Sequence, residues 1–194
     1  MRAAPQFGIG GGTGAAITSE FVLFWSERYR VRPRERDVFG RVGPAVAERG
    51  YYNRDDLLDV VRWKSPRSTT YIGRNSDSDI KELTRIALAA PERLQHRVLC
   101  LLEGVGVPIA SALLTVWEPS IFTVIDYRAI ETLRAQGELD REPDYTHYLQ
   151  VCAALTKRVG TDLRTLDRAL WQWSKDQGKS TGLDLDEVAG TPAE

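Results

Sequence analysis

Apolar residues recur at helical spacing in almost every segment between residues 18 and 179, and no segment alternates convincingly as a strand would. Capping residues and prolines divide these segments. Asn53 stands before one apolar segment, and Ser65-Pro66 ends it, because a residue that precedes proline disfavours the α conformation. The pattern therefore predicts an all-α fold, a compact domain of about nine or ten helices.

The limits of the predicted helices follow from caps and stops. Ser19 is expected to cap the first helix, Thr161 or Asp162 the last, and Gly178 is expected to end it. A helical stretch over 33–49 contains an interruption near Gly43-Pro44. Further helices are expected over 54–64, 79–89, 91–102, 108–117, 127–136, 144–159 and 162–177, with polar turns over 66–78.

The two ends of the chain differ in composition from the middle. Residues 1–17 are rich in Gly and Ala, which predicts a flexible leader, and the run from Gly8 to Gly14 has no preceding strand to make it a phosphate-binding loop. Residues 180–194 contain four acids and no base, which predicts a disordered acidic tail. Subtracting those four from the chain's 27 acids leaves 23 against 26 bases, a net charge of +3, so the domain over 18–179 is mildly basic.

Composition excludes several classes of protein. The net charge of -1 excludes a histone-like polycation. The sequence has no run of about 18 apolar residues, so no transmembrane helix is expected. The N-terminus does not resemble a signal peptide, so Cys100 and Cys152 are expected to be buried thiols of a cytoplasmic protein. Together with His96 and His147 they lack the spacing of metal ligands, and no metal site is expected.

A glycine-rich turn separates two apolar helical segments near the middle of the chain. One segment ends at Leu102, Gly104 and Gly106 follow, and Pro108 opens the next. The amides around Gly104, Gly106 and Val107 lack intrahelical partners and lie at the positive end of a helix, where they could bind a phosphate. The alternative is an ordinary turn between two helices, which uses the same residue types.

The run Leu-Glu-Gly-Val-Gly-x-x-x-Ala, which begins at Leu102, resembles the helix-hairpin-helix element of the DNA glycosylase superfamily that includes endonuclease III, adenine glycosylase and alkyl-base glycosylase. In that superfamily a loop follows the hairpin, and a catalytic aspartate then stands at a helix start. Here the loop is 118–123, and Asp126 lies at about the family's distance. The resemblance covers roughly 79–177, with a weaker likeness at the Trp-rich segment 166–175, and it implies that Asp126 is catalytic and that Gly104, Val105, Gly106 and Val107 bind the DNA backbone.

Departures from the family pattern narrow the expected activity. Pro108 stands where endonuclease III-like lyases carry a lysine, so a Schiff-base lyase step through that position is impossible. The iron–sulfur cysteines of several relatives are absent, and of the loop's usual glycine and proline only Pro119 remains. The resemblance therefore implies a monofunctional glycosylase without a cofactor, although the hairpin could hold a monovalent cation.

The chemistry suits an aspartate at a helix start. Hydrolysis of an N-glycosidic bond passes through an oxocarbenium-like sugar, which one carboxylate can stabilise while it aligns a water molecule. The helix dipole and free amides favour the ionised carboxylate. The alternative role of Asp126 is a plain N-cap, worth about 1 kcal/mol.

A basic and aromatic segment, 62–75, supplies further candidates for a DNA surface. Lys64, Arg67 and Arg74 are candidate phosphate contacts, and a solvated basic loop is the alternative. Lys64 is also a possible alternative amine, which we do not favour.

Aromatic residues are candidates for stacking on an extruded base. Trp63, Tyr71 and Trp117 are assigned this role, although tryptophan at helical spacing more often belongs to a core. Trp171 and Trp173 are expected to lie in or near the core. An arginine series is expected to form a solvated, ion-paired surface, because acids interrupt it and cancel much of its field, and a surface that faces DNA is the alternative. The series is Arg28, Arg30, Arg32, Arg34, Arg36, Arg41 and Arg49, interleaved with Glu27, Glu35, Asp37 and Glu48.

The resemblance therefore implies a DNA glycosylase that acts on a modified or mispaired base flipped out of double-stranded DNA, and such a protein is expected to be monomeric and nucleoid-associated. A non-enzymatic helix-hairpin-helix DNA-binding protein is the alternative, and a helical scaffold domain without a nucleic-acid role is a third possibility.

Overall fold

All regular structure in residues 17–180, the part of the chain that the computed structural model describes, is helical, which confirms the all-α prediction. This part contains eleven α-helices, one π-helical turn, η1, and one 3-10 turn, η2. Their bounds are α1 Ser19–Ser26, α2 Pro33–Asp37, η1 Val38–Val42, α3 Gly43–Arg49, α4 Arg54–Lys64, η2 Pro66–Ser68, α5 Thr69–Ile72, α6 Asp77–Ala89, α7 Glu92–Leu99, α8 Val107–Trp117, α9 Tyr127–Ala135, α10 Tyr145–Val159 and α11 Leu163–Ser180.

Local capping chemistry explains most of the helix limits. The side chains of Asn53 and Asp162 each accept a backbone amide at the start of a helix, as predicted. Thr18, not Ser19, caps α1 in the same way. Gly178 does not end α11, which continues to Ser180, because a glycine inside a helix costs only about 1 kcal/mol.

The stretch over 33–49 is continuous, contrary to the interruption predicted at Gly43-Pro44. Helix α2 passes through the π-helical turn η1 directly into α3. Gly43 allows α3 to approach α8 closely, since a Cβ there would lie 2.4 Å from the carbonyl oxygen of Val116. The segment 66–78, predicted as turns, contains η2, α5 and the first residues of α6.

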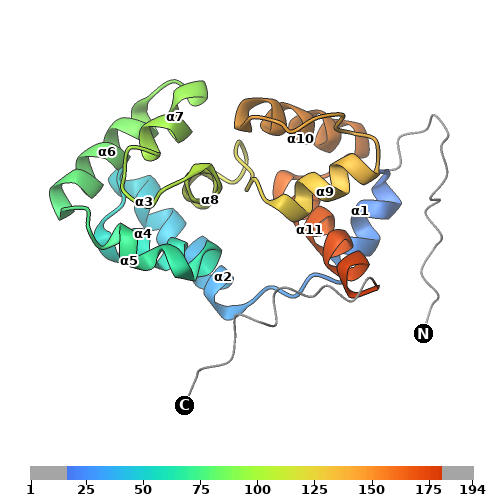
Figure 1. Ribbon diagram of the computed structural model, residues 1–194, viewed down its shortest axis with the longest axis horizontal. Coiled ribbons are helices and arrows are strands. Elements are labelled where there is room, and N and C mark those ends of the chain that lie inside the picture. The colour runs from blue at the N-terminus through green and yellow to red at the C-terminus, as the bar shows by residue number, and fades with distance from the viewer. Residues whose placement is uncertain (1–16, 181–194) are drawn as a thin grey trace, which may run out of the picture.

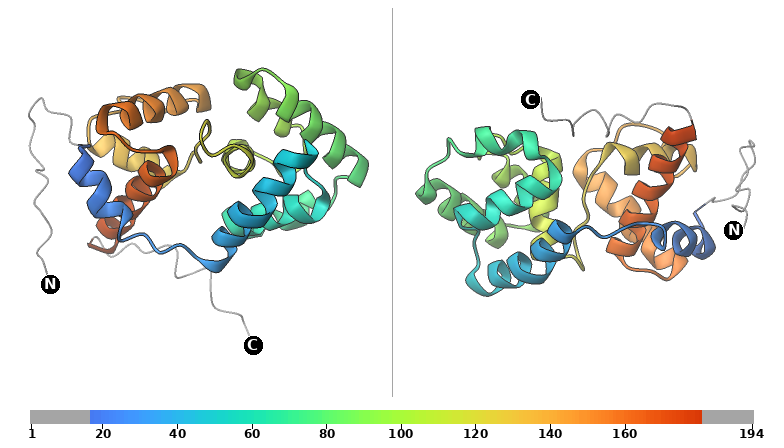
Figure 2. Two further views of the ribbon diagram at one scale, coloured as in Figure 1. Left: turned by 180° about the vertical axis from the view of Figure 1, so that it is seen from behind. Right: turned by 90° about the horizontal axis from the view of Figure 1, so that it is seen from below.

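The helices form two groups that are visible in Figure 1. One group runs from α2 to α8, with α3, α4 and α7 packed on the central helix α8, and the other contains α1, α9, α10 and α11, with α11 packed on the other three. Two segments of backbone, 27–32 and 118–126, cross from one group to the other, as both views in Figure 2 show. Residues at the crossings therefore lie where the two groups meet.

Burial bears on the predicted ends and thiols. The predicted leader covers residues 1–17, but Ile17 is only 1% exposed, so it belongs to the folded part of the chain. Residues 1–16 of the predicted leader and 181–194 of the predicted tail lie outside the described residues. Cys152 is buried and Cys100 half-buried, and burial raises the pKa of both thiols, that of Cys152 to about 12. Within residues 17–180 no helix has the length and apolar character needed to cross a membrane.

Candidate functional site

The backbone that leads to Asp126 is fixed on both sides. The phenol groups of Tyr145 and Tyr148, on α10, donate to the carbonyls of Thr123 and Val124 at 3.1 and 3.0 Å. The amide of Ile125 donates to the hydroxyl of Ser111, on α8, at 3.1 Å. These contacts hold the start of α9 in one place between the two groups of helices.

Asp126 uses its two carboxylate oxygens differently. Oδ1 accepts the backbone amide of Arg128 at 2.9 Å, which confirms the N-cap, and Oδ2 forms an ion pair with the ammonium of Lys64. The Asp126 and Lys64 side chains are 17% and 13% exposed. Lys64 therefore faces the predicted catalytic carboxylate, and its predicted contact with a phosphate stays a prediction.

The segment before Asp126 is held by the N-terminal half of α8. Ser111, which binds the amide of the residue before Asp126, is four residues from the first residue of α8, a rise of about 6 Å. Its hydroxyl also donates to the carbonyl of Pro108 at 2.9 Å, within the first turn of α8. The residue before Asp126 is therefore held by the N-terminal half of α8, and the Asp126 side chain keeps 17% of its surface exposed.

The glycine turn between α7 and α8 packs tightly on α5. Gly104 has φ +81°, and a Cβ at this position would lie 2.7 Å from the Cβ of Tyr71, so only glycine fits. Asn75 holds the turn at Glu103, accepting its amide at 2.8 Å and donating to its carbonyl at 3.0 Å. Arg74, a predicted phosphate contact, instead pairs with the Glu103 carboxylate at 2.8 Å.

Three of the four predicted hairpin amides point to no acceptor in the described part of the chain: those of Gly104, Gly106 and Val107. Gly106 is the N-cap of α8, and both it and Val107 are exposed. Val105 differs, because its amide donates to the carbonyl of Leu102 at 3.1 Å and its side chain is buried. Its main chain is therefore not available to bind a phosphate, contrary to the prediction.

A buried network of charges lies next to the ion pair. Glu35, on α2, is 1% exposed and accepts hydrogen bonds from Arg164 and Arg168, on α11, at 2.7 and 3.0 Å. The phenol of Tyr29 donates to the same carboxylate at 2.8 Å, and burial together with the Glu35 charge raises the pKa of Tyr29. The network joins the two groups of helices, and sequence analysis missed it.

Asp167 completes the network from α11. It pairs with Arg164, and burial raises its pKa to about 6, with smaller contributions from the charges around it. Lys64 and Asp126 are among those charges, so Asp167 lies within electrostatic reach of the ion pair. The carboxylates and cations of the site nearly balance, which allows them to remain charged out of water.

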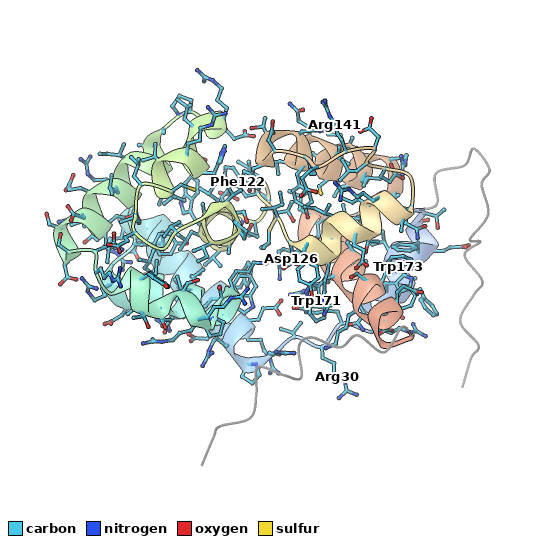
Figure 3. All side chains as sticks on the ribbon, viewed as in Figure 1. Arg30, Phe122, Asp126, Arg141, Trp171 and Trp173 are labelled. Atoms are coloured by element: carbon cyan, nitrogen blue, oxygen red, sulfur yellow. The ribbon has the colours of Figure 1, made fainter. Side chains whose placement is uncertain are left out.

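The predicted aromatic residues are not all brought together. Trp63 is half-buried, packs edge-on against Phe39 at 5.3 Å and precedes Lys64, so it borders the ion pair. Trp117 stacks on Phe122 at the opposite end of α8 from the hairpin, about 15 Å along the helix, and does not belong to this site. Trp171 borders the network and Asp126 lies above it in Figure 3.

Two predicted surface residues remain accessible. Tyr71 is 52% exposed beside the hairpin, with the Arg74 guanidinium 5.1 Å from its ring. Arg67 is exposed on η2, and no carboxylate within residues 17–180 pairs with it. Trp173 is partly buried against the core, as expected.

In the described residues no three His, Cys, Asp or Glu side chains group as they would around a metal ion. The monovalent cation at the hairpin stays a prediction. No protein-family profile, curated protein or solved structure matches the chain. The assignment of a function therefore depends on the geometry of the site.

Proposed function

We propose that this protein is a DNA glycosylase that hydrolyses the N-glycosidic bond of a modified or mispaired base flipped out of duplex DNA, with Asp126 as the catalytic carboxylate. The observation that carries the proposal is the position of Asp126. It starts a helix directly after the residue that Ser111 of α8 holds, its side chain is 17% exposed, and it faces the ammonium of Lys64. A carboxylate that serves only as a helix cap does not need a buried ammonium partner.

The proposed chemistry follows from this environment. As the base departs, positive charge develops on the sugar, and a carboxylate at that place stabilises it. The Arg128 amide fixes one oxygen of Asp126, so the other, now bound by Lys64, is the oxygen available to the sugar. The departing base takes the bonding electron pair and a proton, and water supplies the hydroxyl group to C1′.

DNA contact is assigned to the hairpin and its neighbours. The unpaired amides of Gly106 and Val107 and the exposed guanidinium of Arg67 would bind phosphates, while Tyr71 borders the same surface. Acting on chromosomal DNA would place the protein in the cytoplasm with the nucleoid, and the site needs no second copy of the chain.

A second candidate function is strand cleavage at the abasic product, and the Lys64–Asp126 contact favours it. Pro108 stands where related lyases carry their lysine after the hairpin. In this chain a different amine, that of Lys64 at the end of α4, contacts the Asp126 carboxylate. Once the Lys64 ammonium has passed a proton to the Asp126 carboxylate, the neutral amine would add to the C1′ aldehyde of the ring-opened sugar, and the resulting carbinolamine would lose water to give a Schiff base. Loss of a C2′ proton would then expel the 3′ phosphate.

A panel of labelled duplexes, each with one modified or mispaired base, tests the first proposal. Incubation is followed by alkali, which cleaves abasic sites. We expect release from at least one substrate, lost in Asp126→Asn, which keeps the helix cap and duplex binding. Duplex binding with no release from any substrate would instead favour the non-enzymatic alternative. Borohydride trapping on a preformed abasic duplex, lost in Lys64→Gln, would establish the lyase.

A further inference from the structure

The segment between α1 and α2 forms an arginine strap, which we define as residues 27–32 with Arg28, Arg30 and Arg32. It crosses from α1, packed on α11, to α2, in the other group of helices. Its first two residues form a turn at the end of α1, and residues 29–32 continue as an extended segment; Figures 1 and 2 show the strap along one side of the molecule. It is one of the two covalent crossings between the groups.

Burial alternates along the strap. Tyr29 and Val31 are half-buried, whereas Arg28, Arg30 and Arg32 are exposed. Successive side chains of an extended backbone point to opposite sides, so the strap has an inner and an outer face. Figure 3 shows Arg30 pointing away from the helices.

The inner face fixes the strap to the site. Tyr29 donates to Glu35 at 2.8 Å, and its ring packs edge-on against Trp171 at 5.4 Å. Trp171 in turn lies 5.6 Å from the guanidinium of Arg128, whose amide binds Asp126. The outer arginines are therefore held on an ordered support that continues to the predicted catalytic residue.

The arginines of the series over 28–49 fall into two sets in the structure, one with carboxylate partners and one without. Arg41 pairs with Asp37 and Asp59, and Arg49 pairs with Asp56, as expected for an ion-paired surface. These pairs neutralise one end of the series.

The strap end of the series behaves differently. Arg28 covers the ring of Phe24 at 3.3 Å and donates to its carbonyl. Neither Arg30 nor Arg32 pairs with a carboxylate among residues 17–180, although Glu27 is exposed nearby. The prediction of an ion-paired surface is therefore wrong for these two arginines.

The basic surface continues from the strap toward Lys64. Arg34 is exposed and donates to the carbonyl of Arg62 at 3.1 Å, in the last turn of α4 that also carries Lys64. Arg67 follows on η2 and is also exposed. Two exposed guanidinium groups without a carboxylate partner among residues 17–180, those of Arg34 and Arg67, thus lie near the end of α4 that carries Lys64.

We propose that the arginine strap binds the phosphate backbone of duplex DNA beside the base-excision site, with Arg30 and Arg32 as the contacts; this rests on the proposed function. Guanidinium groups bind phosphate through paired N–H donors. Alternate side chains of an extended segment recur about every 6.6 Å, close to twice the axial charge spacing of about 3.4 Å on one DNA strand. A polyphosphate fits such a row better than a single carboxylate does.

The test measures the affinity for a labelled, undamaged duplex by fluorescence anisotropy between about 50 and 200 mM KCl. The variant is Arg30→Gln/Arg32→Gln. The control is Arg85→Gln/Arg134→Gln, which removes the same charge from two exposed arginines that pair with Glu82 and Glu142. Each lost phosphate contact lowers the slope of log affinity against log salt by about 0.9, so the strap variant is expected to lose about 1.8 and the control far less.

Equal losses in both variants, or no loss in the strap variant, would overturn the inference. So would a wild-type protein that binds phosphatidylserine vesicles through Arg30 and Arg32 but binds no duplex. Thermal melting of both variants establishes that they fold. Base release at saturating DNA separates the two proposals: a strap variant with wild-type binding and wild-type release contradicts only the strap, whereas a wild type that binds DNA but releases no base contradicts only the glycosylase.

Discussion

Breaking the Lys64–Asp126 ion pair from either side is expected to destabilise the protein, while removing both charges is expected to cost less than the sum. The side chains are only 13% and 17% exposed. Removing one partner of a fully buried pair costs about 3–5 kcal/mol, and exposed pairs contribute about 0–1 kcal/mol. We therefore expect about 2–3 kcal/mol for Lys64→Met or Asp126→Asn. Asparagine is also a good N-cap, so the cost of the second change comes from the unpaired ammonium.

Urea unfolding followed by circular dichroism measures these free energies. In thermal melts, about 2–3 kcal/mol corresponds to roughly 4–12 °C for a domain of this size. The double variant leaves no buried charge unpaired, so its cost is expected to fall short of the sum by about 2 kcal/mol. Glu82→Gln breaks an exposed pair with Arg85 and serves as the control, with an expected cost below about 1 kcal/mol.

Additive costs, within about 0.5 kcal/mol, would refute the coupling and with it the geometry of the site. Activity gives an independent result, because stability and catalysis should separate in the double variant. It is expected to be about as stable as either single variant, because the coupling offsets one of the two costs, and to release no base. A double variant that releases base at the wild-type rate would show that Asp126 is not the catalytic group.

Two further changes test the hairpin and the buried network. Gly104→Ala is expected to lower the free energy of unfolding by about 2–4 kcal/mol, because the left-handed φ costs about 1–2 kcal/mol and the added Cβ would lie 2.7 Å from the Cβ of Tyr71. Gly137→Ala is the control: Gly137 has φ +73° and open space around it, so this change should show the φ cost alone. Equal costs for the two variants in urea unfolding would contradict the close packing at Gly104. Burial raises the pKa of Asp167 to about 6 from 3.8, so the folded protein binds this proton more tightly: its contribution to stability is complete below about pH 4 and is lost as the pH rises through about 6. Asp167→Asn should flatten unfolding free energies measured over this range, and a curve parallel to that of the wild type would contradict the assignment.

Local chemistry made part of the fold predictable. Asn53 and Asp126 each cap a helix through an amide two or three residues away, and such contacts are visible in the sequence. The π-helical turn before Gly43 was not predictable, because the close approach of Gly43 involves Val116 on a distant segment. Gly178 failed as a stop because glycine permits a helix end without requiring one.

The sequence predicted only that part of the candidate site that a single residue and its local neighbours identify. Asp126 stands out because of its place after the hairpin and before a helix. Its partnership with Lys64 joins residues 62 apart, and the contact between Glu35 and Arg164 joins residues 129 apart. Nothing in the local sequence distinguishes these charges from solvated ones, since their pairing depends on how the two groups of helices meet.

The ion pair imposes a condition on how Asp126 can act. One of its oxygens is held by the Arg128 amide and the other by the Lys64 ammonium, so a sugar that binds to the second oxygen competes with the ammonium. An uncharged sugar in the ground state is attracted to the carboxylate much less strongly than the Lys64 ammonium is. A sugar that has gained positive charge offers an equivalent cation in the same place. The exchange therefore favours the transition state over the bound substrate, and this difference is what accelerates a reaction.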